Sequence, residues 1–199
     1  MLKDVTYFRR FRMEINLRQV ELPIPVLPER YFWTAWTTDP YASTILERHA
    51  ETKHLCFQNE LDANVFPCLG DREVCLRLMN DIARQSSFLP EATWLLSFRN
   101  FDDIIHDVGT IQGLAHTSMV GAIQNIGVVS DHRSQGLGRA LVLQCLRGFQ
   151  QIGIPRVSLE VTADNRHAID LYKKIGFRIV RTMYRDAEPQ TSQQPSNLF

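Results

Sequence analysis

Apolar and polar residues alternate with a period of two near the start of the chain. Over residues 7–17 the apolar side chains share one face and the polar side chains share the other, which is typical of a half-buried β-strand. The segment 21–30 then holds three prolines, which cannot donate to a sheet, so we expect an extended connector. Residues 30–36 predict a second strand. The apolar face of the first strand consists of Phe11, Met13, Ile15 and Leu17.

Four later segments have the helical spacing of three and four residues between apolar positions. Asp39-Pro40 predicts the start of the first helix, which runs to residue 57, and Asp71 predicts the start of the second, which runs to residue 85. Residues 135–151 and 165–175 predict two more helices, each followed by a glycine. The apolar stripe of the 135–151 helix consists of Leu137, Leu141, Cys145 and Phe149.

Five further apolar segments predict strands. Short turns between the first three favour an antiparallel meander. The order is then strands, two helices, three strands, helix, strand, helix, strand, which predicts an α/β fold in which helices flank a central mixed β-sheet. The tail 186–199 is poor in apolar residues, so we expect it to be disordered. The five segments are 92–98, 107–115, 120–129, 156–162 and 177–184.

Composition excludes several partners. The 199 residues contain 22 Lys+Arg and 22 Asp+Glu, so the formal net charge is zero, and no overall field favours nucleic acid or an anionic membrane. No apolar run approaches the roughly 18 residues that cross a bilayer, and arginines interrupt the N-terminal segment, so we expect neither an anchor nor a signal peptide. A 44% hydrophobic content is enough for one sizeable core.

The cysteines favour a reducing compartment. None of them has the spacing of a zinc site, so we expect free thiols, no metal and a cytoplasmic location. The four cysteines are Cys56, Cys68, Cys75 and Cys145.

Residues 131–142, DHRSQGLGRALV, lead from a predicted strand into a predicted helix. The two glycines there require an explanation, because a glycine lowers helix stability by about 1 kcal/mol relative to alanine. Gly136 and Gly138 would let a ligand approach the first-turn amides, which have no intrahelical partner and lie at the positive end of the helix dipole. Such amides bind phosphate, and Arg133 can add a charge-assisted hydrogen bond. A tight turn without a ligand is the alternative interpretation.

Two other nucleotide-binding motifs do not fit this loop. The dinucleotide fingerprint needs a third glycine where Leu141 stands, and a Walker loop needs Gly-Lys-Ser/Thr, which the chain lacks.

The context of the loop supports a family resemblance. Residues 126–142 match R-x-x-G-x-G across a strand, a loop and a helix, and residues 160–177 follow with EVTADNRHAIDLYKKIGF. In this order and spacing the two segments resemble the GNAT N-acetyltransferase superfamily. The resemblance covers residues 92–184 and is weaker over 29–90. It implies the GNAT fold for residues 29–185, with residues 1–28 as an extra N-terminal strand and connector.

The resemblance also implies acetyl-CoA as cofactor and a set of site residues. Ile126, Gly127 and Val128 would lie along the pantetheine arm, and a backbone N–H, that of Val128, would bind the oxyanion. Asn165 would contact the cofactor arm, although it is also a good helix N-cap. Tyr172 would be the general acid that protonates the departing thiolate, although a core position is the alternative. The pyrophosphate would lie on the amides of Arg133, Ser134, Gln135, Gly136, Leu137, Gly138 and Arg139.

The general base and the acceptor are not assigned by the sequence. The strand 120–129 has no carboxylate, and Glu160 either serves as the base, faces solvent or pairs with an arginine. Asp102, Asp103 and Asp107 either attract a cationic amine or form a solvated acidic loop. We therefore expect an N-acetyltransferase for the primary amine of a small molecule or peptide, with a CoA-binding sensor or scaffold as the alternative.

One feature departs from the family pattern at the C-terminal end, where the chain lacks the closing β-hairpin. We expect the strand 7–17 to pair beside 177–184 and to supply the absent partner, because an uncovered apolar edge promotes aggregation. The pairing would form either within the chain or by exchange in a homodimer.

Overall fold

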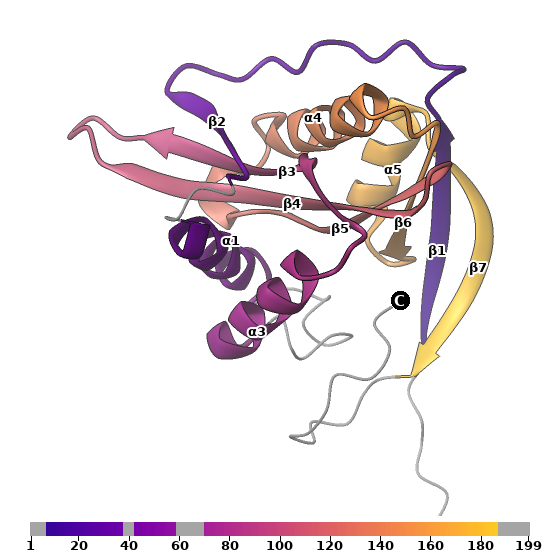
Figure 1. Cartoon of the computed structure of the whole chain (residues 1–199), viewed down its shortest axis with the longest axis horizontal. Coiled ribbons are helices and arrows are strands. Elements are labelled where there is room, and N and C mark those ends of the chain that lie inside the picture. Colours follow the sequence, from indigo (N-terminus) through magenta and orange to yellow (C-terminus); the bar gives the residue numbers. More distant parts are fainter. Residues whose placement is uncertain (1–6, 38–41, 59–69, 187–199) are drawn as a thin grey trace, which may run out of the picture.

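The computed structural model describes residues 7–37, 42–58 and 70–186 (Figure 1). Seven strands form one sheet, and four α-helices flank it. The strands are β1 (Tyr7–Asn16), β2 (Tyr31–Ala35), β3 (Phe88–Arg99), β4 (Ile105–Thr117), β5 (Val120–Val128), β6 (Arg156–Thr162) and β7 (Arg178–Asp186). The helices are α1 (Ala42–Phe57), α3 (Arg72–Ala83), α4 (Leu137–Gln151) and α5 (Arg166–Ile175), with a short 3₁₀ turn, η2, at Ser130–His132.

The predicted mixed sheet is confirmed. Its order is β2-β3-β4-β5-β6-β1-β7, with β3, β4 and β5 as the expected antiparallel meander and β5 parallel to β6. Helices α1 and α3 lie on one face of the sheet, and α4 and α5 lie on the other (Figure 1).

Strand β1 lies inside the sheet rather than at its border. It pairs antiparallel with β7, as the sequence predicts for 7–17 and 177–184, and it does so within the single chain. It also pairs antiparallel with β6, from Arg10↔Thr162 to Asn16↔Arg156, which was not expected. Alternation with a period of two shows that a strand is half buried, but it does not show how many neighbours the strand has. Exchange of β1 between two copies stays a prediction.

The connector after β1 crosses the molecule to reach β2 at the opposite border of the sheet (Figure 1). It contains no strand, as its prolines predict. Its start is fixed by a hydrogen bond from the Leu17 amide to the Pro155 carbonyl, 2.7 Å. Leu22 is buried, and Val20 and Leu27 pack against the main core.

The helix starts agree with the sequence where they are described. Asp71 caps α3 by accepting a hydrogen bond from the Val74 amide at 2.9 Å. Asp39-Pro40 and the tail 187–199 lie outside the described residues. Along α3 the buried residues are Cys75, Met79 and Ile82.

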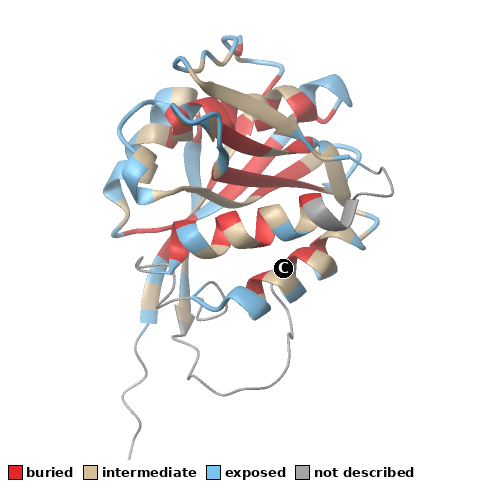
Figure 2. Ribbon diagram, turned by 90° about the vertical axis from the view of Figure 1, so that its left-hand side faces the viewer, coloured by how far each residue is buried: buried red, intermediate tan, exposed pale blue. Residues whose placement is uncertain are grey.

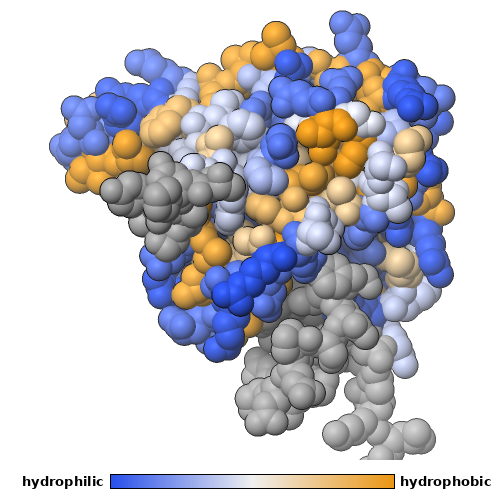
Figure 3. All heavy atoms as spheres, viewed as in Figure 1, coloured by the Kyte–Doolittle hydropathy of each residue, from blue (hydrophilic) through white to orange (hydrophobic). Residues whose placement is uncertain are grey.

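Helix α4 is the most deeply buried helix of the described chain. All four residues of its predicted stripe, Leu137, Leu141, Cys145 and Phe149, are buried against the sheet. Figure 2 shows the buried residues gathered along the middle strands and the inner faces of the helices. On the face seen in Figure 3, hydrophobic side chains reach the surface in patches between hydrophilic ones. No described helix is both long and apolar enough to cross a membrane.

Candidate functional site

Strand β5 separates from β6 after a short stretch of pairing. The two strands pair over three residues, and the pairing ends at Ala122 and Ser158. Against β4, strand β5 carries one extra residue between Gln124 and Gly127, and Asn125 in this segment has a φ of 50°. A bulge of this kind bends a strand and increases its twist. Beyond Ala122, the border of β5 that faces β6 is therefore left without a ladder partner.

The backbone of Val128 is directed into this gap. The Val129 amide donates to the Val108 carbonyl of β4 at 2.9 Å. Successive residues of an antiparallel strand point their N–H groups in opposite directions, so the Val128 N–H points away from β4 and toward the gap. The N–H group expected to bind an oxyanion is thus on the open side of β5.

The loop after β5 presents a row of unpaired amides. Within the described part of the chain, the amides of 134–139 donate no hydrogen bond. Gly136 and Ser134 both have left-handed φ angles, 80° and 62°, and this alternation turns successive amides toward one concave side. A Cβ at Gly136 would meet nothing within 4 Å, and one at Gly138 would meet only Leu171 Cδ2, at 3.6 Å. The space before the amides is open, and the residues present fit a diphosphate.

Arg133 braces the start of this loop. Its Nε donates to the Val128 carbonyl at 2.8 Å, and its Nη2 donates to the Cys56 carbonyl at 3.2 Å. The Arg133 amide donates to the Ser130 carbonyl at 3.1 Å, so this N–H group is already occupied. The bond expected from the Arg133 side chain to a ligand stays a prediction, whereas its contact with β5 and α1 is structural.

A tyrosine of β2 also contacts the amide loop. The Tyr31 hydroxyl lies 2.8 Å from His132 Nδ1 and 3.2 Å from Gln135 Oε1, so β2 contacts the loop directly. Phe98 packs against both rings, with centroids 4.8 Å from Tyr31 and 5.1 Å from His132. Burial lowers the pKa of His132, which favours the neutral imidazole beside the tyrosine.

Gly127 allows α1 to lie directly on β5. A Cβ at this position would come within 2.6 Å of Cys56 Cβ and 3.2 Å of Phe57 Cε2. Glycine is therefore required by close packing, and this reason is independent of any ligand. Its expected contact with a cofactor arm stays a prediction.

Tyr172 lies in the same core cluster that Ile126 and Val128 pack against. Its side chain is buried, and its ring centroid is 5.9 Å from that of Phe177. The structure thus places the predicted tyrosine and the predicted strand in one core cluster. Both the core interpretation and the catalytic interpretation of Tyr172 are compatible with this position.

Asn165 and Glu160 have structural partners. Asn165 Oδ1 accepts a hydrogen bond from the Ala168 amide at 3.1 Å, which makes it the N-cap of α5, as its residue type predicts. Glu160 Oε2 lies 3.7 Å from Arg10 Nε. Of the three alternatives for Glu160, the structure thus shows an ion pair with an arginine on a side chain that is also 45% exposed.

A buried polar group that the sequence did not predict lies between α1 and β4. Gln112 Nε2 donates to Thr110 Oγ1 at 2.6 Å, and Thr110 Oγ1 lies 2.8 Å from His49 Nδ1. Gln112 Nε2 also lies 3.3 Å from His49 Nδ1, whereas His49 Nε2 has no partner among the described residues. Burial is the main cause that lowers the pKa of His49 well below its ordinary value, and the nearby cations Lys53 and Arg48 lower it further.

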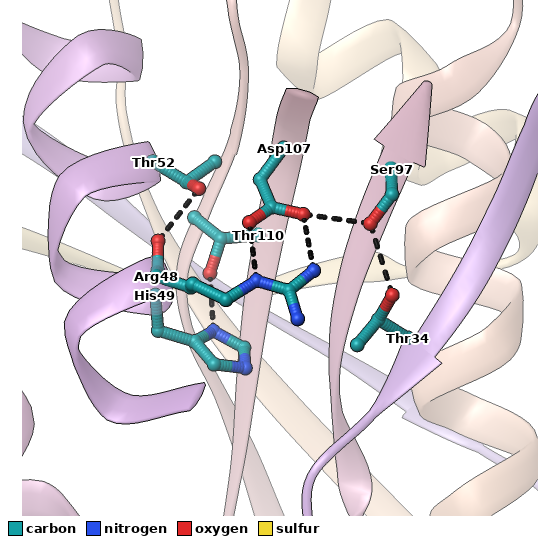
Figure 4. Close-up of polar contacts among 7 residues, drawn as sticks. All are labelled: Thr34, Arg48, His49, Thr52, Ser97, Asp107 and Thr110. Carbon is teal, nitrogen blue, oxygen red and sulfur yellow. Dashed lines mark hydrogen bonds and ion pairs between the residues drawn. The ribbon is translucent and has the colours of Figure 1, made fainter. Parts of the chain in front are cut away.

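An ion pair joins the same helix to the start of β4 (Figure 4). Arg48 donates to both carboxylate oxygens of Asp107, at 2.7 and 2.8 Å, and this bonding raises the pKa of the guanidinium. Ser97 donates to Asp107 at 2.6 Å and contacts Thr34 Oγ1 at 2.9 Å. The Asp107 carboxylate is thus paired with Arg48 of α1 and does not attract a cationic amine, which was one of its two expected roles. Asp103 lies 3.9 Å from Arg99.

Comparison with known proteins fits this geometry. The family model described as Acetyltransferase (GNAT) family matches residues 81–177, from the end of α3 to the start of β7. Residues 81–177 of this chain thus match the GNAT acetyltransferase family. A GCN5-related N-acetyltransferase from Sphaerobacter thermophilus shares the fold with a TM-score of 0.64 and 21% identity, over 95% of this chain and 55% of that one. The family and the fold expected from the sequence are both confirmed.

Curated relatives of this GNAT domain are named as acetyltransferases. A mycothiol acetyltransferase of Thermobifida fusca is 39% identical over 75 residues, which is 38% of this chain and 23% of the relative. The [ribosomal protein bS18]-alanine N-acetyltransferase of Escherichia coli K12 is 36% identical over 86 residues, 42% of this chain and 57% of the relative. The chain thus spans about a quarter of the length of the first curated relative it matches. The names of these relatives agree with the acyltransferase class expected from the sequence.

Proposed function

We propose that this GNAT protein transfers an acetyl group from acetyl-CoA to the primary amine of a small molecule or peptide. The observation that carries the proposal is the row of amides at 134–139, which have no partner in the described chain and lie where β5 and β6 diverge. Acetyl-CoA would supply a thioester carbonyl and a thiolate leaving group. The cytoplasmic location expected from the sequence is part of this proposal.

The chain's own groups supply the rest of the chemistry. The amides 134–139 and the positive end of α4 hold the diphosphate. The Val128 N–H donates to the oxygen that gains negative charge as the amine nitrogen bonds to the acetyl carbon. Tyr172 donates its hydroxyl proton to sulfur as the C–S bond breaks. The amine loses one proton in the same turnover, so charge balances, and the described residues assign no base to it.

Calorimetry with a matched pair of variants tests the binding half of the proposal. Gly136 and Gly153 have nearly the same φ, 80° and 79°, and neither would bring a Cβ within 4 Å of another group. Gly136→Glu places a carboxylate before the amides, whereas Gly153→Glu carries the same backbone strain at the far end of α4. We expect Gly136→Glu to abolish acetyl-CoA binding and Gly153→Glu to retain it. Equal binding by both variants would contradict the proposal.

Thiol release from acetyl-CoA in the presence of a panel of amines tests the catalytic half. Tyr172→Phe should lower kcat by about 10²-fold or more, as expected for loss of a general acid. Tyr184→Phe is the control, because Tyr184 is 69% exposed on β7.

A CoA-binding sensor or scaffold is the second candidate. The observation that favours it is that β5 carries no carboxylate and that Glu160 is paired with Arg10. In that case acetyl-CoA would bind normally, and no amine in the panel would release thiol above the rate of the Tyr172→Phe variant.

A further inference from the structure

Successive side chains of β1 lie on opposite faces of the sheet, and the register shows which helices share each face. Directly paired residues lie on the same face. Met13 pairs with Leu159 and Ile15 pairs with Val157, and all four are buried in the main core. Val157 also pairs with Gly121, where a Cβ would run into Phe149 of α4. The apolar residues of β1 therefore lie on the α4 side, and the alternate residues lie on the side that carries α1.

This second face is strongly basic. Across β6, β1 and β7 it carries six arginines and two glutamates, although the whole chain has zero net charge. Arg12 and Arg181 are directly opposite one another, an arrangement that is destabilising unless an anion or solvent separates the charges. We call this set the basic face. Its arginines are Arg10, Arg12, Arg156, Arg178, Arg181 and Arg185, and its glutamates are Glu14 and Glu160.

Each of the two glutamates contacts one arginine of this face. Glu14 accepts from Arg12 Nε at 3.2 Å, and Glu160 lies 3.7 Å from Arg10. In the part of the chain that the structure describes, Arg178 and Arg181 make no ion pair, and both are exposed. Two exposed guanidinium groups without carboxylate partners are suited to a carboxylate or a phosphate.

The basic face borders the proposed reaction site. Arg10 is opposite Thr162, the last residue of β6, at the end where β6 has separated from β5. Phe8 and Arg185 form the next cross-strand pair on this face. Helix α1 covers β4 and β5 on the same side of the sheet, with Cys56 against Gly127. A molecule that reaches the gap between β5 and β6 from the α1 side therefore enters beside the end of the basic face that holds Arg10 and Arg185.

We propose that the acceptor is a small amine that also carries an anionic group, a carboxylate or a phosphate, and that the basic face binds this group. The proposal rests on the acetyl transfer proposed above. It explains why a chain without net charge places six arginines on one face of β6, β1 and β7, with Arg10 and Arg185 at the end nearest the gap.

The proposal is tested with pairs of amines in which one member carries an anionic group that the other lacks. With acetyl-CoA as donor, O-phosphoethanolamine is compared with ethanolamine, and β-alanine with propylamine. We expect the anionic member of at least one pair to have a kcat/KM about tenfold or more above that of its neutral partner. The pair with the larger kcat/KM ratio shows whether the site prefers phosphate or carboxylate. Arg181→Gln should raise the KM for the anionic acceptor about fivefold or more and leave that for acetyl-CoA unchanged. Lys174→Gln, on the exposed part of α5, is the charge-matched control.

A binding measurement separates this proposal from the proposed function. Calorimetry of O-phosphoethanolamine and β-alanine, with CoA present, should give heats that Arg181→Gln and Arg178→Gln weaken, whether or not turnover occurs. Failure of the chain to bind acetyl-CoA would overturn the acetyl transfer but leave these heats. Normal acetyl transfer with no preference for anionic amines, or with a peptide of neutral residues preferred to all four probes, would overturn the basic face as an acceptor site. An Arg181→Gln substitution that changed only the KM for acetyl-CoA would also overturn it.

Discussion

The Arg133 guanidinium holds the carbonyl oxygen of Val128 at 2.8 Å, on the same residue whose N–H faces the gap. This contact fixes the end of β5 relative to the amide loop, and a second bond to Cys56 at 3.2 Å fixes both to α1. The position of the oxyanion donor thus depends on a side chain that belongs to the phosphate loop.

Arg133→Ala should therefore weaken acetyl-CoA binding without unfolding the protein. We expect a loss of about tenfold in affinity, which corresponds to one charge-assisted hydrogen bond of about 1.5 kcal/mol. Calorimetry measures the affinity, and Gln150→Ala, exposed near the end of α4, is the control. Unchanged affinity for the alanine variant would show that the loop holds its shape without this brace.

Asn125 offers a test of the bulge itself. Its φ of 50° is tolerated by asparagine and glycine but is strained for a β-branched residue by about 1–2 kcal/mol. Asn125→Val should lower the urea midpoint and also kcat, because relief of the strain would draw β5 toward regular pairing. Asn125→Gly should keep both values near those of the parent. If Asn125→Val were as active as Asn125→Gly, the separation of β5 from β6 would not depend on the bulge.

The sequence predicted the parts of this site that depend on local chemistry. Gly136 is recognisable because a glycine at a helix start leaves the first amides without a side-chain cap. Asn165 is recognisable because asparagine is a common N-cap. The tertiary partners were not accessible in this way. His49 and Lys53 lie on the buried side of α1, where a helical pattern predicts apolar residues. Their partners, Thr110 of β4 and Met79 of α3, are distant in sequence and are known only from the structure. Asp107 looks like a member of an acidic loop until Arg48, distant in sequence, is placed beside it.

His49 predicts that stability falls in mild acid. Its pKa in the folded protein is well below 6.5, the ordinary value that applies to the unfolded chain. The unfolded chain therefore binds more protons as the pH falls below about 6.5, and the free energy of unfolding decreases there, whereas it is constant above that range. Urea unfolding at about pH 8 and about pH 5.5 measures the difference. His49→Gln should reduce it, and His116→Gln, exposed at the end of β4, should not.

The Arg48–Asp107 pair should couple more strongly than a surface pair. Asp107 is 13% exposed and accepts three hydrogen bonds, so loss of Arg48 leaves a poorly solvated carboxylate. A double-mutant cycle with Arg48→Met and Asp107→Asn should give a coupling free energy of about 1–3 kcal/mol. The pair Arg72–Glu51, whose side chains are 56% and 43% exposed, is the internal comparison and should give less than about 1 kcal/mol. Equal coupling in the two cycles would contradict this assignment.

Removal of β1 tests whether the sheet depends on a strand from the opposite end of the chain. Because β1 pairs with β6 on one side and β7 on the other, deletion of residues 1–18 exposes two unpaired strands and removes Met13 and Ile15 from the core. Unpaired strands of this kind promote aggregation, so we expect insoluble protein. Addition of a peptide of residues 1–18 during refolding should restore solubility and acetyl-CoA binding, because the missing strand is supplied without a covalent link. A soluble truncated protein that is active without the peptide would show that β6 and β7 can pair directly, and the same result would exclude exchange of β1 as the basis of a dimer.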